Sequence, residues 1–208
     1  MLNLDFEKSV FYSGYNNVAG VDEAGRGPLA GPVVAGCVLI GRHTKIDKEL
    51  MDKCRDSKKL TEKKRKYLFD LITKKIEHYA IGVCDVHVID KINILEATFL
   101  AMKKAISNLQ LQPDFVLVDG KIKIKNLNIE QEAIVKGDSQ VLSIALASIL
   151  AKVTRDMIME DLHKKYPNYS FDKHKGYGTK LHMERLQIFG PSLVHRTSFR
   201  PVSDLIKK

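Results

Sequence analysis

The chain is poor in the residues that make disulfide frameworks and in the apolar runs that cross membranes. Among its 208 residues there are three cysteines and no tryptophan. The odd number of cysteines, with no CxxC spacing, argues against a zinc site or disulfide framework and indicates free thiols in a reducing compartment. No apolar run reaches the roughly 20 residues of a membrane span, and the N-terminal MLNLDFEKSV has no apolar signal core. We therefore expect a cytoplasmic protein that does not bind a membrane.

The signatures of several large enzyme classes are also missing. The sequence has no GxSxG and no P-loop, and GVDEAGRGP lacks the GxGxxG order of a dinucleotide-binding turn. Its histidines form no HExxH; His163, His174 and His182 are scattered in the polar C-terminal part, where we expect them to be surface or loop residues. Serine hydrolases, P-loop NTPases, dinucleotide-dependent enzymes and zinc proteases are therefore disfavoured.

Acidic residues are outnumbered by basic ones, which gives the chain a formal net charge of +9. A basic excess of this size favours a polyanionic partner, nucleic acid first and an anionic membrane second. The composition is 44% hydrophobic, enough for a full core. We expect a single domain over residues 1–208, with a core at about 18–166 and a C-terminal helical extension at about 167–208.

Apolar periodicity predicts strands that alternate with helices. Strands are predicted over 18–21, 32–40, 79–86, 115–118 and 129–135. Helices are predicted to begin at caps Thr61 and Asp90, and to run over 141–166 and about 180–189. This order indicates the α/β class with a mixed sheet. Sites in open α/β sheets gather at strand ends, and both Asp22 and Asp119 end a predicted strand.

Four carboxylates form the candidate catalytic cluster: Asp22, Glu23, Asp119 and Asp138. Singly, each has an ordinary explanation as a solvated turn, an Asp-Gly turn or a helix cap. Brought to one sheet edge, they would repel and raise one another's pKa unless a cation lay between them. Mg²⁺ binds such oxygens together with phosphate, and a pair of ions about 3.5–4 Å apart supports displacement at phosphorus. On a basic protein, this combination predicts metal-dependent cleavage of a nucleic-acid backbone.

Six blocks of the sequence resemble, in order, the motifs of the type 2 ribonuclease H family (ribonuclease HII). They cover about 18–202, nearly the whole chain, and they are GVDEAGRGPLAGPVVAG, RDSKKL, FVLVDG, VKGDS with ASILAKVTRD, HKGYGT and HRTSFRPV. The resemblance implies a ribonuclease H-like fold, a central mixed five-stranded sheet flanked by helices, with a C-terminal helical extension. It also implies cleavage of the RNA strand of RNA–DNA hybrids, leaving 5′-phosphate and 3′-hydroxyl ends.

The resemblance assigns roles to particular residues. It makes Asp22, Glu23, Asp119 and Asp138 the catalytic acids and the ligands of Mg²⁺ or Mn²⁺, two ions in the catalytic complex. Asp156 is left out of this set, because we expect it to form an ion pair or face solvent. The substrate-binding residues are expected to be Gly25, Arg26, Gly27, Lys58, Lys59 and Tyr177. The glycine-rich turn lets a backbone approach the 2′-hydroxyl that distinguishes RNA from DNA, and Tyr177 packs on the neighbouring sugar.

The expected substrates are RNA–DNA hybrids and duplex DNA with single ribonucleotides, incised on their 5′ side, and the expected role is removal of misincorporated ribonucleotides and RNA primers. Three alternatives are weighed. A type 3 ribonuclease H would need a large N-terminal domain, for which Asp22 lies too near the start, and it lacks the Gly-Arg-Gly turn. A silent nucleic-acid-binding module is disfavoured by the four intact acids, and a junction resolvase by the motif blocks. We expect a monomer that needs no clamp partner.

Overall fold

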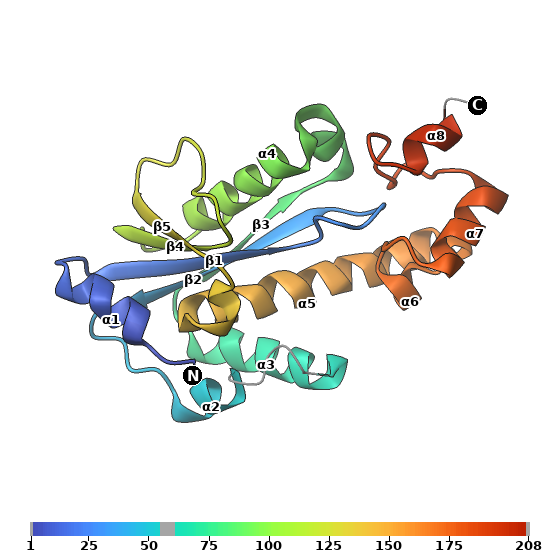
Figure 1. Ribbon diagram of the computed structural model, residues 1–208. Coiled ribbons are helices and arrows are strands. Elements are labelled where there is room, and N and C mark those ends of the chain that lie inside the picture. Colours follow the sequence, from blue (N-terminus) through green and yellow to red (C-terminus); the bar gives the residue numbers. More distant parts are fainter. Residues whose placement is uncertain (1, 55–60, 207–208) are drawn as a thin grey trace.

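The computed structural model describes residues 2–54 and 61–206, and it places one sheet between two layers of helices (Figure 1). The elements follow one another as α1 (Asp5–Tyr12), β1 (Asn17–Ala24), β2 (Val33–Gly41), α2 (Lys48–Cys54), α3 (Glu62–Lys75), β3 (Tyr79–Cys84), α4 (Val86–Ser107), β4 (Phe115–Asp119), β5 (Glu130–Ile134), the 3₁₀ turn η2 (Gly137–Ser139), α5 (Leu142–Lys165), the 3₁₀ turn η3 (Pro167–Tyr169), α6 (Phe171–His174), α7 (Lys180–Phe189) and α8 (Val202–Ile206).

The five strands form a mixed sheet in the order β3-β2-β1-β4-β5, which confirms the predicted fold class. Strands β1, β2 and β3 pair antiparallel, whereas β1, β4 and β5 run parallel. Parallel strands end at the same edge of a sheet. The ends of β1 and β4 and the turn after β5 therefore meet at one edge, and this is what gathers the predicted acids.

Alternation along β1 decides which helix covers which face. Val18 packs with α5 and its neighbours in one core cluster, while Ala19 and Val21 pack with α4 in the other. Figure 1 shows α4 on one side of the sheet and the long α5, with α3 beyond it, on the other. Helix α5 lies very close to the sheet, because a Cβ atom on Gly36 would come within 2.2 Å of the Ala147 carbonyl oxygen.

The start of α4 differs from the prediction that Asp90 caps it. The helix begins at Val86, and its cap is Asp85, five residues earlier than predicted, whose carboxylate accepts the Val88 N–H at 3.0 Å. Asp90 instead accepts from Thr197 and Ser198 of the C-terminal segment. The carboxylate that the local pattern predicts to be a helix cap therefore makes a long-range contact with the C-terminal segment instead.

The C-terminal helices are joined to the sheet through the loop between β1 and β2. Leu29 N–H donates to the Gly176 carbonyl, and Gly31 N–H donates to the Val194 carbonyl, each at 2.8 Å. A third apolar cluster, which includes Leu29 and Phe171, seals this junction. Figure 1 shows that loop reaching toward the red C-terminal helices. Among the described residues, no helix is long and apolar enough to span a membrane.

Candidate active site

The predicted acids lie at one edge of the sheet. Asp22 and Glu23 are near the end of β1, Asp119 is the last residue of β4, and Asp138 lies in η2, just after β5. Asp22 is only 6% exposed, and burial, aided by the charges of Glu23 and Asp119, raises its pKa well above the usual range. The hydroxyl of Ser148 on α5 and the Glu23 N–H, at 2.7 Å, oppose this shift only in part.

Glu23 has a similar environment with one compensating cation. Burial raises its pKa, while Arg26, whose Nη1 lies 3.1 Å from its carboxylate, partly offsets that effect. The charge of Asp119 also acts on Glu23. Asp22, Glu23 and Asp119 therefore form one electrostatically coupled group, as the sequence predicts.

Asp138 joins this group through the backbone of its turn. The carboxylate of Asp119 accepts the N–H of Gly137 at 2.7 Å and that of Asp138 at 3.4 Å. Gly137 has little room for a side chain, since a Cβ there would meet Ile144 Cδ1 at 2.7 Å. The turn thus orients Asp119 and fixes Asp138 beside it.

The donor set fits a hard divalent cation. It consists of carboxylate oxygens and is partly buried, and burial together with the charges of Glu23 and Asp119 raises the pKa of Asp22, so a bound cation would favour its ionised form. As the side chains stand, no three His, Cys, Asp or Glu residues of the described chain surround a single point that could hold an ion. Mg²⁺ does not require that, because it keeps several waters and takes one or two carboxylates together with phosphate oxygens.

A cleft of about 290 Å³ opens beside the acids. Glu23, Arg26, Asp119 and Lys121 give it a charged side, and apolar side chains of α4 form the other wall. The cleft therefore offers oxygen ligands for a cation and positive charge for a phosphate in the same place.

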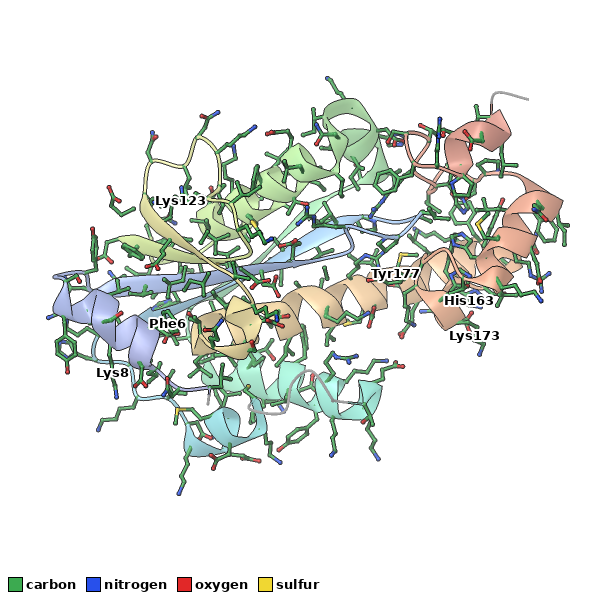
Figure 2. The ribbon with its side chains drawn as sticks, in the orientation of Figure 1. Phe6, Lys8, Lys123, His163, Lys173 and Tyr177 are labelled. Atoms are coloured by element: carbon green, nitrogen blue, oxygen red, sulfur yellow. The ribbon has the colours of Figure 1, made fainter. Side chains whose placement is uncertain are left out.

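The predicted sugar-binding residues lie together at the junction with the C-terminal helices. Gly27 is exposed, and a Cβ atom built on it would lie 4.0 Å from Cε1 of Tyr177. Tyr177 is 43% exposed, and its ring lies 5.8 Å from the guanidinium carbon of Arg155. Figure 2 shows Tyr177 where the end of α5 meets the C-terminal helices. Gly25 has a φ of 101°, a left-handed conformation that favours glycine.

Other predictions have different outcomes. Lys58 and Lys59 lie outside the described residues, so their expected role stays a prediction. Asp156 is buried and forms the expected ion pair, with Lys152, while its exclusion from the catalytic set stays a prediction. The expectation for His174 and His182 was wrong, because both are buried helical residues.

Buried histidines support the backbone of Tyr177. Ser192 N–H donates to Nδ1 of His195 at 2.9 Å, so the His195 proton is on Nε2 and is donated to Nε2 of His182 at 3.0 Å. His182 then donates from Nδ1 to the Tyr177 carbonyl at 2.9 Å. Burial lowers the pKa of both imidazoles to about 4, so both are neutral at pH 7. We call His195 and His182 the histidine chain.

Two buried arginines were also missed by the sequence analysis. Arg155 and Arg196 donate to main-chain carbonyls of the β1–β2 loop. Their signal was present, since they occur in the VTRD and HRTSFRPV stretches. Nothing local distinguishes them, however, from the many exposed basic residues of this chain.

Comparison with known proteins agrees with the motifs and the site. The family model described as Ribonuclease HII matches residues 19–202. Ribonuclease HII of Caldicellulosiruptor bescii is 54% identical over 195 residues, covering 94% of this chain and 92% of the relative. The ribonuclease H2 crystal structure from Pyrococcus horikoshii OT3 superposes with a TM-score of 0.76 at 28% identity, covering 92% of this chain and 97% of that one.

A more distant structure, Bst-RNase HIII in complex with Mn²⁺, has a TM-score of 0.69 at 16% identity and covers 92% of this chain and 70% of its own, which shows the shared fold. The family match and the close relatives confirm the resemblance read from the motif blocks. The protein is an endoribonuclease of the ribonuclease H class, and the chain belongs to the ribonuclease HII family.

Proposed function

We propose that this ribonuclease H, whose family acts on RNA–DNA hybrids, also incises duplex DNA on the 5′ side of a single embedded ribonucleotide, leaving 5′-phosphate and 3′-hydroxyl ends. Its role is then to remove misincorporated ribonucleotides and RNA primers. One observation carries the proposal: Asp22 and Glu23, two of the coupled acids, lie near the end of the strand that leads directly into the loop with Gly27, and Gly27 adjoins Tyr177. In this proposal, the acids cleave the backbone, and the adjoining Gly27 and Tyr177 recognise a single sugar.

The acids Asp22, Glu23, Asp119 and Asp138 hold Mg²⁺ or Mn²⁺ in this proposal, two ions when substrate is bound. Such ions supply Lewis-acid activation and charge neutralisation at the phosphate. The protein residues set the geometry: Gly137 and Asp138 N–H groups orient Asp119, and Ser148 acts on Asp22 from α5. Arg26 and Lys121 place positive charge at the cleft, where the substrate phosphate would lie.

Recognition of RNA rests on a small part of the loop in this proposal. Arg26 and Gly27 bring exposed backbone close to a sugar, because Gly27 has no Cβ to hold it away, while the buried Gly25 leaves room for the Arg155 side chain beneath the turn. The half-exposed ring of Tyr177 packs on the adjacent sugar. A recognition site of this size contacts one 2′-hydroxyl and does not require a long A-form helix. Lys58 and Lys59 are proposed to contact phosphates, which position a duplex without reading its sequence.

We further propose that the enzyme works as a monomer in the cytoplasm. The cysteines Cys37, Cys54 and Cys84 are free and buried, as suits a reducing compartment.

The test is a cleavage assay on two labelled duplexes, one with a continuous RNA strand and one with a single ribonucleotide in DNA, each with Mg²⁺ and with EDTA. We expect metal-dependent cleavage of both, with the single site cut on its 5′ side. Cleavage of the continuous strand alone would contradict the single-ribonucleotide proposal. Binding of both duplexes without any cleavage would favour the silent binding module.

A further inference from the structure

Arg196 is a fully buried arginine whose guanidinium is surrounded by main-chain carbonyls. Its Nη2 donates to Gly25 O at 2.6 Å, and its Nη1 donates to Arg26 O at 2.9 Å. Further bonds reach Gly31 O, at 3.0 Å from Nε, and Pro32 O, at 3.2 Å. Among the described residues, it has no carboxylate within salt-bridge distance. The positive charge is therefore satisfied by the carbonyls of the loop that contains the Gly-Arg-Gly turn.

Because the peptide bond is planar, the direction of these carbonyls also fixes the direction of the next N–H groups. In a trans peptide, the C=O of one residue and the N–H of the next point in opposite directions. The carbonyls of Gly25 and Arg26 point inward at Arg196, so the N–H groups of Arg26 and Gly27 point away from it. Both residues are exposed, and within the part of the chain described neither backbone N–H donates a backbone hydrogen bond.

Arg155 ties this loop to the segment that carries Tyr177. Its guanidinium donates to Ala30 O at 3.1 Å and to Pro32 O at 3.0 Å, and also to Lys175 O at 3.0 Å. The outward N–H groups are thus held in register with the tyrosine ring. Near Tyr177, the loop therefore presents N–H donors to a ligand, while the carbonyls of Gly25 and Arg26 already accept hydrogen bonds from Arg196.

We propose that Arg196 is a positioning residue for substrate recognition, which acts by binding the carbonyls of Gly25 and Arg26 so that the N–H groups of Arg26 and Gly27 face the substrate. The inference rests on the proposed function. Outward N–H groups bind oxygen acceptors, and the acceptor chemistry available at this site is the sugar 2′-oxygen or a phosphate oxygen of the same nucleotide. A lysine could not replace this arginine, because a single ammonium does not supply the planar fork that spans several carbonyls.

The test compares Arg196→Lys with a matched control, Arg42→Lys. Arg42 also donates to main-chain carbonyls, those of Phe11 and Tyr15, but it lies at the opposite end of β2. The dissociation constants are measured with Ca²⁺, for a duplex with one ribonucleotide and for the same duplex as DNA throughout. Thermal melting and near-ultraviolet circular dichroism report on the fold of each variant.

Wild type and Arg42→Lys are expected to prefer the ribonucleotide duplex. Arg196→Lys is expected to lose about tenfold of that preference, the value of one net hydrogen bond, with less than twofold change on all-DNA duplex. That result assigns the 2′-oxygen as the acceptor, whereas an equal loss on both duplexes supports the positioning role with phosphate as the acceptor. A folded Arg196→Lys with unchanged binding to both duplexes overturns the inference. A wild-type protein without any preference would instead contradict the proposed function.

A second measurement uses the wild-type protein and does not depend on the variant's folding. Amide hydrogen exchange is followed by NMR for Arg26 and Gly27, free and with each duplex in Ca²⁺. Both amides are expected to exchange fast in the free protein and to slow on binding. Slow exchange in the free protein, or no change on binding either duplex, would overturn the inference.

Discussion

Acid should weaken the C-terminal region through the histidine chain. Each imidazole is neutral and has a defined tautomer, because His195 receives from Ser192 and donates to His182, which donates to the Tyr177 carbonyl. A proton added to His182 would set its Nε2–H against the Nε2–H of His195. Burial is the main reason that the charged form is disfavoured, and this N–H conflict acts in the same direction, so the pKa of each imidazole is lowered from 6.5 to about 4.

The sign of the effect follows from proton linkage. Between about pH 4 and 6.5, the unfolded chain binds more protons at these sites than the folded protein does, so stability rises with pH. The contribution is fully present above pH 6.5 and is lost as pH falls toward 4. At pH 5, one histidine with these two pKa values contributes a loss of about 2 kcal/mol. The pair shares a hydrogen bond, so the two losses need not add.

The assay is urea unfolding followed by circular dichroism, from pH 7.5 to pH 5.0, for the wild type and two variants. His182→Asn can retain a donor for Tyr177 O but cannot titrate, so the fall in stability between pH 7.5 and 5.0 should shrink by about 2 kcal/mol. The exposed His87 provides the control, and His87→Asn should leave the fall unchanged. The raised pKa of Asp22 acts in the opposite sense, but it is common to all three proteins.

Equal slopes for wild type and His182→Asn would refute the argument. Hydrogen exchange would locate the effect, since opening at pH 5 should reach the segments around Tyr177 before it reaches β1 and β4. Substrate recognition should then be lost at a higher pH than the sheet itself.

Three further predictions concern two of the acids and the tyrosine. Asp119→Asn should lower cleavage of labelled hybrid by at least ~10³-fold; near-normal turnover at saturating Mg²⁺ would remove Asp119 from the site. Without divalent cations at pH 7.5, Asp22→Asn should raise the free energy of unfolding in urea titrations, because it removes a carboxylate whose charged form burial disfavours; a destabilised variant would contradict this. Tyr177→Ala should slow cleavage at a single ribonucleotide roughly 10- to 100-fold in a time course, and should slow cleavage of a long hybrid less.

Much of the sheet and its flanking helices could be predicted, because their patterns are local. The strand over 115–118 is continuous apolar sequence, and the observed β4 extends it by one residue, Asp119. Helix α7 was predicted over its observed range, and α5 to within a residue at each end. The short helices α1 and α2 were not predicted. The buried Glu7 of α1 accepts the N–H of Ser143, at the start of α5, a contact between residues 136 positions apart.

The acids of the site could be predicted because each is attached to an element with a local sequence pattern. The buried residues that hold the site in shape could not be predicted, because their contacts are with distant segments. A carboxylate at the end of a strand has a place in space as soon as the strand is recognised, and parallel strands bring such ends together. The position of the Arg196 side chain cannot be predicted in this way, because its partners Gly25 and Arg26 lie 171 and 170 residues away in the chain. Its burial can be known only once the C-terminal segment is seen lying against the β1–β2 loop. On this reasoning, the acids are far apart in the sequence, but each lies near the end of, or just after, an element with clear local periodicity. The residues that aim the sugar-reading loop are polar groups of ordinary appearance, whose role arises when distant segments meet.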